Sequence, residues 1–125
     1  MRRGEIWLVA LEPTVGAEIG KTRPLVIVSD ETVGILLLEV IVPITDWKER
    51  YTERNWMVRL EPSGENGLAK VSAADAFQVR SVSQERFVRQ LGTLSETIIR
   101  NLGLKPRLKR TAFCRQKYNA LGYFK

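Results

Sequence analysis

Short apolar runs separated by turn-forming residues occupy the first two thirds of the chain. One run extends over residues 6–11 and ends at Pro13, which is typical of a strand. A second covers residues 24–29 and contains the unbroken stretch Leu25-Val26-Ile27-Val28, which predicts a strand buried on both faces. The same pattern predicts further strands at residues 35–43 (interrupted by Glu39), 56–60, 68–72 and 76–82. The turn formers at 61–67, which end in Asn66-Gly67, predict the connection between two of them.

The period of the apolar positions changes after residue 82 and becomes helical. One helix is predicted from Ser83, as its N-cap, to Gly92; its apolar stripe consists of Phe87, Val88 and Leu91. A second is predicted from Ser95 to Gly103; its stripe consists of Ile98, Ile99 and Leu102. Short strands followed by helices favour a mainly β fold, a small antiparallel barrel with short helices packed on it.

The length and charge of the chain divide it into a body and a tail. A chain of 125 residues has room for one domain, which we place at residues 1–103. Residues 1–96 contain 14 acidic and 12 basic residues, a net charge of −2, whereas residues 97–125 contain 8 basic residues and no acidic one. We therefore interpret residues 104–125 as a basic C-terminal extension, either helical or mobile.

The composition excludes several kinds of chemistry. The chain has no histidine, so it lacks a histidine general base and a histidine metal site. Cys114 is the only cysteine, which excludes an internal disulfide and a cysteine zinc cluster and fits a reducing cytoplasm. No apolar run is long enough to span a membrane, and the N-terminus does not resemble a signal peptide. We expect a cytoplasmic protein with no membrane contact, no metal and no cofactor.

Two polar segments stand at the ends of neighbouring apolar runs. Residues 16–23 form a loop hinged by glycines that brings Glu18, Lys21 and Arg23 to the start of a buried strand. Residues 42–46 end the next strand with Thr45 and Asp46. An arginine and a hydroxyl at one point suit a phosphate, because the guanidinium offers a planar fork of donors and the hydroxyl adds another.

These segments carry a resemblance to a known family that covers about residues 1–102. Several pieces, in the right order and spacing, resemble the MazF/PemK toxin endoribonucleases: Arg3-Gly4-Glu5-Ile6-Trp7, Pro13-Thr14-Val15-Gly16, Glu18-Ile19-Gly20-Lys21-Thr22-Arg23-Pro24, Pro43-Ile44-Thr45 and Gln78-Val79-Arg80-Ser81-Val82-Ser83. The resemblance implies a CcdB/PemK-like, SH3-like barrel that forms a homodimer. It also implies metal-independent cleavage of single-stranded RNA, and inhibition by a cognate antitoxin protein in a type II toxin–antitoxin system.

The resemblance also implies site residues. The catalytic arginine of the family falls on Arg23, its catalytic threonine on Thr45 and its loop glutamate on Glu18. An RNA-contacting glutamine falls on Gln78, with Arg80 at the adjoining position of the strand. Since arginine remains protonated and histidine is absent, we expect Glu18 to accept the proton of the ribose 2′-hydroxyl, with Asp46 as the second candidate. Lys21 and Asp46 complete the predicted RNA-binding set.

Other interpretations remain open at this point. The same barrel suits a CcdB-like toxin that binds a protein such as DNA gyrase, and the basic tail suits a silent RNA-binding module. Gln78 and Arg80 also fit a solvated strand face. The aromatic and cationic segment at residues 47–51 suits stacking on RNA bases. For Trp47 and Trp56 we favour packing at the barrel edge or a dimer contact.

The tail generates a first prediction. If residues 105–125 bind RNA without sequence preference, they do so by releasing counterions, which makes affinity depend steeply on salt. Deleting them is expected to flatten the dependence of RNA affinity on salt concentration and to leave the choice of cut site unchanged. Filter binding across a salt series measures the slope, and an unchanged slope would contradict the assignment.

Overall fold

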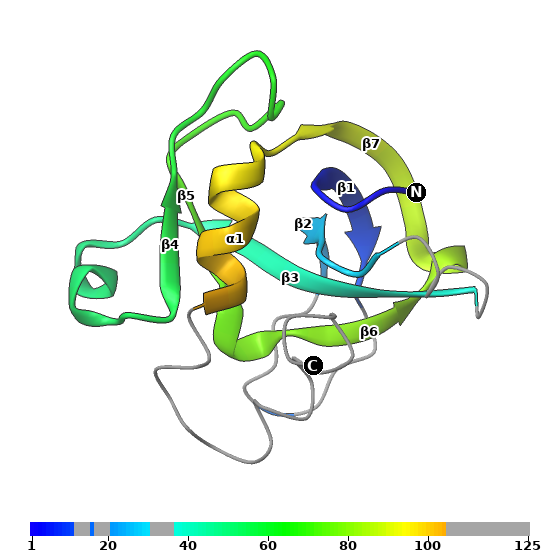
Figure 1. Cartoon of the computed structure of the whole chain (residues 1–125), viewed down its shortest axis with the longest axis horizontal. Coiled ribbons are helices and arrows are strands. Elements are labelled where there is room, and N and C mark those ends of the chain that lie inside the picture. Colours follow the sequence, from blue (N-terminus) through cyan, green and yellow to red (C-terminus); the bar gives the residue numbers. More distant parts are fainter. Residues whose placement is uncertain (12–15, 17–20, 31–36, 105–125) are drawn as a thin grey trace.

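One curled antiparallel sheet makes up most of the fold (Figure 1). The computed structural model describes residues 1–11, 16, 21–30 and 37–104. The strands are β1 (Glu5–Ala10), β2 (Thr22–Ile27), β3 (Leu38–Asp46), β4 (Met57–Leu60), β5 (Ser72–Asp75), β6 (Arg80–Ser83) and β7 (Phe87–Thr93). The helical elements are the 3-10 turns η2 (Glu49–Glu53), η3 (Ala76–Gln78) and η4 (Gln84–Arg86), and helix α1 (Glu96–Leu104). The expected barrel-like, mainly β fold is confirmed.

Strand β3 lies at the centre of the sheet, whose strand order is β4-β5-β3-β2-β1-β7. One edge of β3 pairs with β2, where Leu25 lies opposite Pro43. The other edge pairs first with β6 and then with β5, and η3 lies between these two partners in the chain. Each half of β3 therefore belongs to a different part of the barrel.

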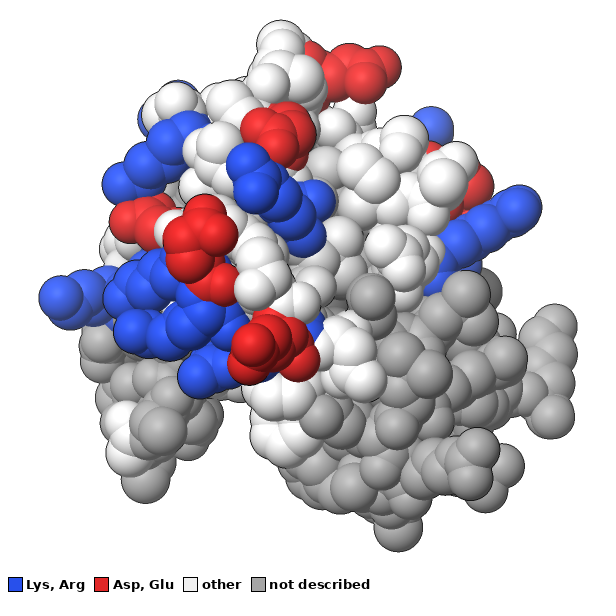
Figure 2. Space-filling model, turned by 90° about the vertical axis from the view of Figure 1, so that its left-hand side faces the viewer, with Lys and Arg blue, Asp and Glu red and all other residues white. Residues whose placement is uncertain are grey.

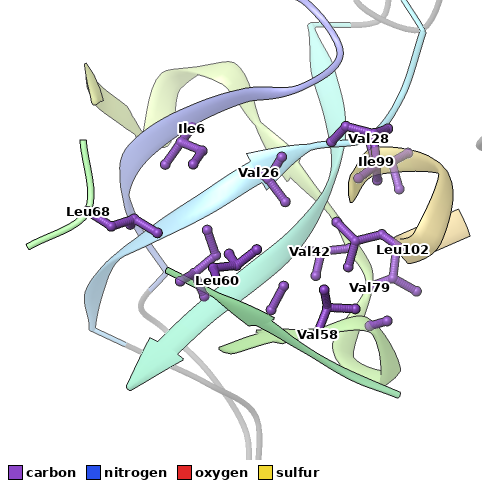
Figure 3. Close-up of a cluster of buried hydrophobic side chains, with 14 residues drawn as sticks. Ile6, Val26, Val28, Val42, Val58, Leu60, Leu68, Val79, Ile99 and Leu102 are labelled. Carbon is purple, nitrogen blue, oxygen red and sulfur yellow. The ribbon is translucent and has the colours of Figure 1, made fainter. Parts of the chain in front are cut away.

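The barrel interior is filled by aliphatic side chains that alternate along the strands. Its members include Ile6 of β1, Val26 of β2 and Val42 of β3. Helix α1 lies between the β4–β5 pair and the β1–β7 pair in Figure 1. It contributes Ile99 and Leu102, which lie beside the other members of the cluster in Figure 3. The predicted stripe of the second helix thus faces the core, and the Ser95 side chain accepts a bond from the Ile98 amide at 3.4 Å, as its N-cap position implies.

A second apolar cluster covers the opposite face of β2. Leu25 and Ile27 pack there with Ile41, while Val26 faces the barrel interior. Because successive side chains of a strand point to opposite faces, these two clusters bury both sides of β2. The prediction made from the unbroken apolar stretch is therefore confirmed. Trp7 and Phe87 complete the outer cluster and meet edge to face, with ring centroids 5.7 Å apart.

Glu39, which interrupts the apolar pattern of β3, is buried in a small polar network. Its carboxylate accepts one hydrogen bond from the Ser29 hydroxyl at 2.7 Å and another from the Gln84 side-chain amide at 3.0 Å. The Ser29 oxygen in turn accepts a bond from the Val40 amide at 3.2 Å. The network satisfies a buried carboxylate and joins the end of β2 to β3 and η4. The predicted strand at 35–43 is thus β3, shifted to Leu38–Asp46.

The helix predicted between Ser83 and Gly92 is wrong. Ser83 does act as a cap, with its hydroxyl accepting from the Glu85 amide at 3.3 Å, but it caps only the single turn η4. The following residues form β7, which pairs with β1 in three stretches separated by two irregularities in register. Because of these irregularities, Phe87 packs in the outer cluster and Leu91 in the interior one, although they lie four residues apart on one strand. Pairing with β1 therefore overrides the helical period of the sequence.

The strand predicted at residues 76–82 is also broken. Asp75 accepts a hydrogen bond from the Phe77 amide at 3.1 Å and so closes the turn η3 at the start of that segment. Only Arg80–Ser83 continues as β6, and Phe77 is exposed whereas Val79 is buried. The strand predicted at 68–72 begins later, at Ser72. α1 continues through Gly103 rather than ending there.

The connection between β4 and β5 crosses closely over β7. A Cβ atom added at Gly92 would lie 2.2 Å from the Glu65 carbonyl oxygen. The opposing Gly67 adopts φ +68°, and a Cβ there would lie 2.1 Å from the Leu91 carbonyl oxygen. Gly92 therefore serves a close approach of two backbones and not the end of a helix.

We expect Gly92→Ala to lower the free energy of unfolding by about 1–3 kcal/mol, because a methyl group has to displace backbone atoms there. Gly64→Ala is the matched control, since a Cβ at Gly64 meets nothing within 4 Å. Urea denaturation of both variants measures the difference. Equal free energies of unfolding for the two variants would show that the backbones at Gly92 and Glu65 are not in close contact.

Candidate active site

The structure brings Arg23 and Thr45 together across two neighbouring strands. Continuing the β2–β3 pairing two residues beyond Leu25 and Pro43 places Arg23 of β2 opposite Thr45 of β3. The Arg23 guanidinium donates through Nη1 to the Thr45 Oγ1 at 3.4 Å. Both side chains are half-buried, so neither is sealed inside the barrel. A cation and a hydroxyl in contact at the molecular surface suit a phosphate group.

Lys21 lies two residues before Arg23 in an unusual backbone conformation. Its φ is +64°, in the left-handed region that L residues rarely adopt, and its side chain is exposed. The Leu11 amide donates to the Lys21 carbonyl at 2.9 Å and joins the end of β1 to the start of β2. Such strain next to a candidate catalytic residue is typical of functional loops. Glu18, the predicted proton acceptor, lies outside the described residues.

Thr45 belongs to a row of side chains on the outer face of the sheet. It lies opposite Ala73 of β5, which lies opposite Arg59 of β4. Residues directly opposite in antiparallel strands share a face, so these side chains and Arg23 point the same way. The adjacent row of Ile44, Ala74 and Val58 fills the barrel interior, which establishes that the Thr45 row faces outward.

Asp46 ends β3 and is exposed. As the neighbour of Thr45 along the strand, it points to the opposite face of the sheet. Its carboxylate forms an ion pair with Lys70, with Nζ and Oδ2 3.0 Å apart. The structure therefore does not join Asp46 to the Arg23–Thr45 pair.

Gln78 and Arg80 lie at the junction of η3 and β6. Both are half-buried, and Arg80 begins β6 opposite Ile41. Gln78 donates to the Asp75 carboxylate through both its backbone amide and its side chain. The contact fixes the Gln78 amide group beside the outer sheet face, since Asp75 ends β5 two residues after Ala73.

Asp75 is a buried carboxylate that the sequence pattern did not single out. Only 5% of the residue is exposed, and burial raises the pKa of its carboxyl above the ordinary 3.8. Hydrogen bonds from Phe77 and Gln78 and the positive charge of Arg54 oppose this shift without cancelling it. One signal was present in the sequence: an aspartate in the small-residue run Ser72-Ala73-Ala74-Asp75-Ala76 suits a turn that its side chain closes.

Comparison with known proteins assigns the fold to a family. Residues 2–105 match the family described as the PemK-like, MazF-like toxin of type II toxin–antitoxin systems. The chain belongs to this family. The match spans Arg23, Thr45, Gln78 and Arg80, so every described candidate residue lies within the MazF-like part of the chain.

Individual relatives agree with this assignment. The chain is 32% identical over 101 residues to the endoribonuclease MazF9 of Mycobacterium tuberculosis, covering 76% of this chain and 83% of that protein. The crystal structure of MazF from Deinococcus radiodurans matches with a TM-score of 0.73 and 21% identity, over 89% of this chain and 97% of that one. A mycobacterial endoribonuclease solved in complex with its cognate antitoxin matches with a TM-score of 0.63 and 16% identity, over 84% and 89% of the two chains. Within the described part of this MazF-like chain, no helix has the length and apolar character needed to cross a membrane.

The raised pKa of Asp75 predicts a pH-dependent effect on stability. A carboxyl whose pKa is higher in the folded than in the unfolded state stabilises the fold at acid pH and loses this contribution as the pH rises through the folded pKa. Asparagine does not titrate and keeps an oxygen for the Phe77 amide. We therefore compare the free energies of unfolding of Asp75→Asn and of the wild type at two pH values. As the pH is raised from below 3.8 to neutral, the difference between them is expected to change in favour of Asp75→Asn.

Asp75→Ala is the control for the turn itself. It removes the oxygen that accepts from Phe77 and is expected to cost about 1 kcal/mol at neutral pH. Urea denaturation at both pH values measures all three proteins. A difference between Asp75→Asn and wild type that does not change with pH would contradict the burial of a charged group.

Proposed function

We propose that the chain is the toxin of a type II toxin–antitoxin pair and that it cleaves single-stranded RNA without a metal ion. The observation that carries this proposal is the contact between Arg23 and Thr45, at 3.4 Å, on the outer face of the barrel. Membership of the toxin family and relatives named endoribonucleases support it. A CcdB-like binder of gyrase has no need of an arginine and a hydroxyl placed to hold a phosphate.

RNA supplies its own nucleophile, which determines what the protein has to provide. The ribose 2′-oxygen loses its proton and forms a bond to phosphorus, while the bond from phosphorus to the 5′-oxygen breaks and that oxygen gains a proton. The products are a 2′,3′-cyclic phosphate and a free 5′-hydroxyl. The protein has to orient these atoms in line, move the two protons and stabilise the additional negative charge on the phosphate.

We assign the charge stabilisation to Arg23, because its guanidinium stays protonated and offers several donors. Thr45 holds a non-bridging phosphate oxygen or the 2′-hydroxyl. Glu18 remains the expected proton acceptor. The ion pair of Asp46 with Lys70, on the opposite face from Thr45, makes Asp46 the weaker candidate for that step. Lys21, Gln78 and Arg80 are assigned to RNA binding.

The partners follow from the same assignment. One solved relative is an endoribonuclease with its cognate antitoxin, and by similarity we expect this chain to bind an antitoxin protein of its own. We also expect a homodimer, which sedimentation equilibrium can test. The substrate implies a site of action in the cytoplasm, where messenger RNA is translated.

We expect Arg23→Ala to reduce the single-turnover cleavage rate of single-stranded RNA about 100- to 1,000-fold, the loss typical for one preorganised donor to a developing oxyanion. Thr45→Val removes the hydroxyl at nearly constant shape and is expected to reduce the rate as well. The assay is run in EDTA, and sequencing of the cleaved ends reports the cyclic phosphate and the cut site.

Arg100→Ala is the control, because Arg100 is an exposed arginine of α1 whose Nε lies 3.8 Å from Glu96. It is expected to cleave at the wild-type rate. A folded Arg23→Ala protein with the wild-type rate would overturn the assignment of the site.

A further inference from the structure

Aromatic rings and arginines gather on the segment between β3 and β4, on the outer face of β4 and on η3. The group comprises Trp47, Tyr51, Arg54, Trp56, Arg59 and Phe77, and is called the aromatic–arginine surface below. Trp47 meets Tyr51 edge to face, with centroids 5.8 Å apart, and Trp56 meets Phe77 at the same centroid distance. Trp47 and Trp56 pack against the buried Tyr51 and Met57, which confirms their expected packing at the barrel edge.

The arginines of this surface lie over the rings. The Arg54 guanidinium lies 5.3 Å from the Tyr51 centroid and 5.8 Å from that of Trp56. The Arg59 guanidinium lies 5.3 Å from the Trp47 centroid. Arg59 also pairs with Glu61 at 2.8 Å, but both side chains are about half exposed or more, and such pairs exchange readily with other anions.

The aromatic–arginine surface is continuous with the candidate active site. Ala73 packs in the cluster with Tyr51 and Met57, and the same residue lies directly opposite Thr45. Neighbouring strands are about 4.8 Å apart, so the row from Arg23 through Thr45 and Ala73 to Arg59 spans about 14 Å. Ala73 is fully buried in this cluster with Tyr51 and Met57, so the cluster covers the middle of the row and borders directly on Thr45.

Three rings of this surface are more exposed to solvent than side chains that only pack in a core. Phe77 is 48% exposed, although its ring contacts Trp56, and Trp47 and Trp56 are only half-buried. Flat rings with guanidinium groups beside them are the platform on which proteins stack the bases of single-stranded nucleic acid.

We propose that the aromatic–arginine surface stacks the bases of single-stranded RNA next to the phosphate held by Arg23 and Thr45. The inference rests on the proposed function, and it adds a base-binding subsite to the reaction centre. Phe77 and Trp56 provide the stacking faces, and Arg54 and Arg59 hold the adjoining backbone or stack themselves. Gln78, bonded to Asp75 beside Phe77, lies next to the base so bound.

Continuity with the phosphate site favours RNA over a second protein as the occupant. A strand whose phosphate lies at Arg23 and Thr45 meets this surface directly beside Thr45, where the cluster covers Ala73, whereas a protein surface has no such connection to the reaction. Charge alone does not decide between them. Figure 2 looks onto the side of the molecule where β4 and η2 lie, and Lys and Arg alternate there with Asp and Glu.

The test separates binding from cleavage by means of a probe that cannot react. A pool of random single-stranded oligonucleotides with 2′-O-methyl riboses offers bases and phosphates but no free 2′-hydroxyl. Its affinity for the full chain is measured by fluorescence anisotropy. Phe77→Ala is expected to weaken binding about 5- to 150-fold, the range found when one stacking ring is removed. Phe77→Trp is expected to restore it.

Val88→Ala is the matched control, because Val88 of β7 is also an exposed apolar side chain, at 59%. It is expected to bind the pool as the wild type does. An otherwise identical pool without bases provides the second control. Phe77→Ala and wild type are expected to bind this abasic pool equally, because stacking requires the base.

Wild-type affinity of Phe77→Ala for the base-bearing pool would overturn the inference. If the same variant also loses self-association in sedimentation equilibrium, the surface belongs to a contact with a second copy of the chain. The proposed function fails separately, through Arg23→Ala and the cleavage of unmodified RNA.

Discussion

The pairing of β3 with three other strands is the constraint on which both the fold and the site depend. Its residues alternate between the barrel interior, where Ile44 packs, and the outer face, where Thr45 meets Arg23. The same ladder aligns Thr45 with Ala73. A shift of one residue in this register would exchange the two faces, burying the hydroxyl and exposing the core. The apolar core therefore fixes the geometry of the polar site.

Those parts of the structure that depend on local pattern could be predicted from the sequence. The doubly buried β2 follows from its unbroken apolar run, and α1 follows from a cap and a stripe of period 3.6. The meeting of Arg23 and Thr45 was predicted because each stands at the end of a strand in a recognised motif. Its atomic contact depends on the register between β2 and β3, which no local pattern contains.

The remaining features depend on contacts between distant segments. Phe87 and Leu91 stand four residues apart, as on a helix, but pairing with β1 makes them part of a strand. Gly92 looked like the end of that helix, whereas it is required where residues 65 and 66 cross β7. The aromatic–arginine surface likewise needs Arg59 and Phe77, which lie on separate elements beyond the segment at 47–51 that first indicated it.

Asp75 joins Gln78 to the aromatic–arginine surface through one buried charge. Its carboxylate closes the turn that exposes Phe77, accepts from Gln78 and is attracted by Arg54, which lies over Tyr51 and Trp56. Burial works against this charge, as the raised pKa of the carboxyl indicates. An asparagine would cap the turn without that cost, but it would attract Arg54 less and could not hold the Gln78 amide in a single orientation, because it offers a donor as well as an acceptor. At a cost in stability, the carboxylate thus fixes the arrangement of Gln78 and Arg54, the groups that are proposed to bind RNA.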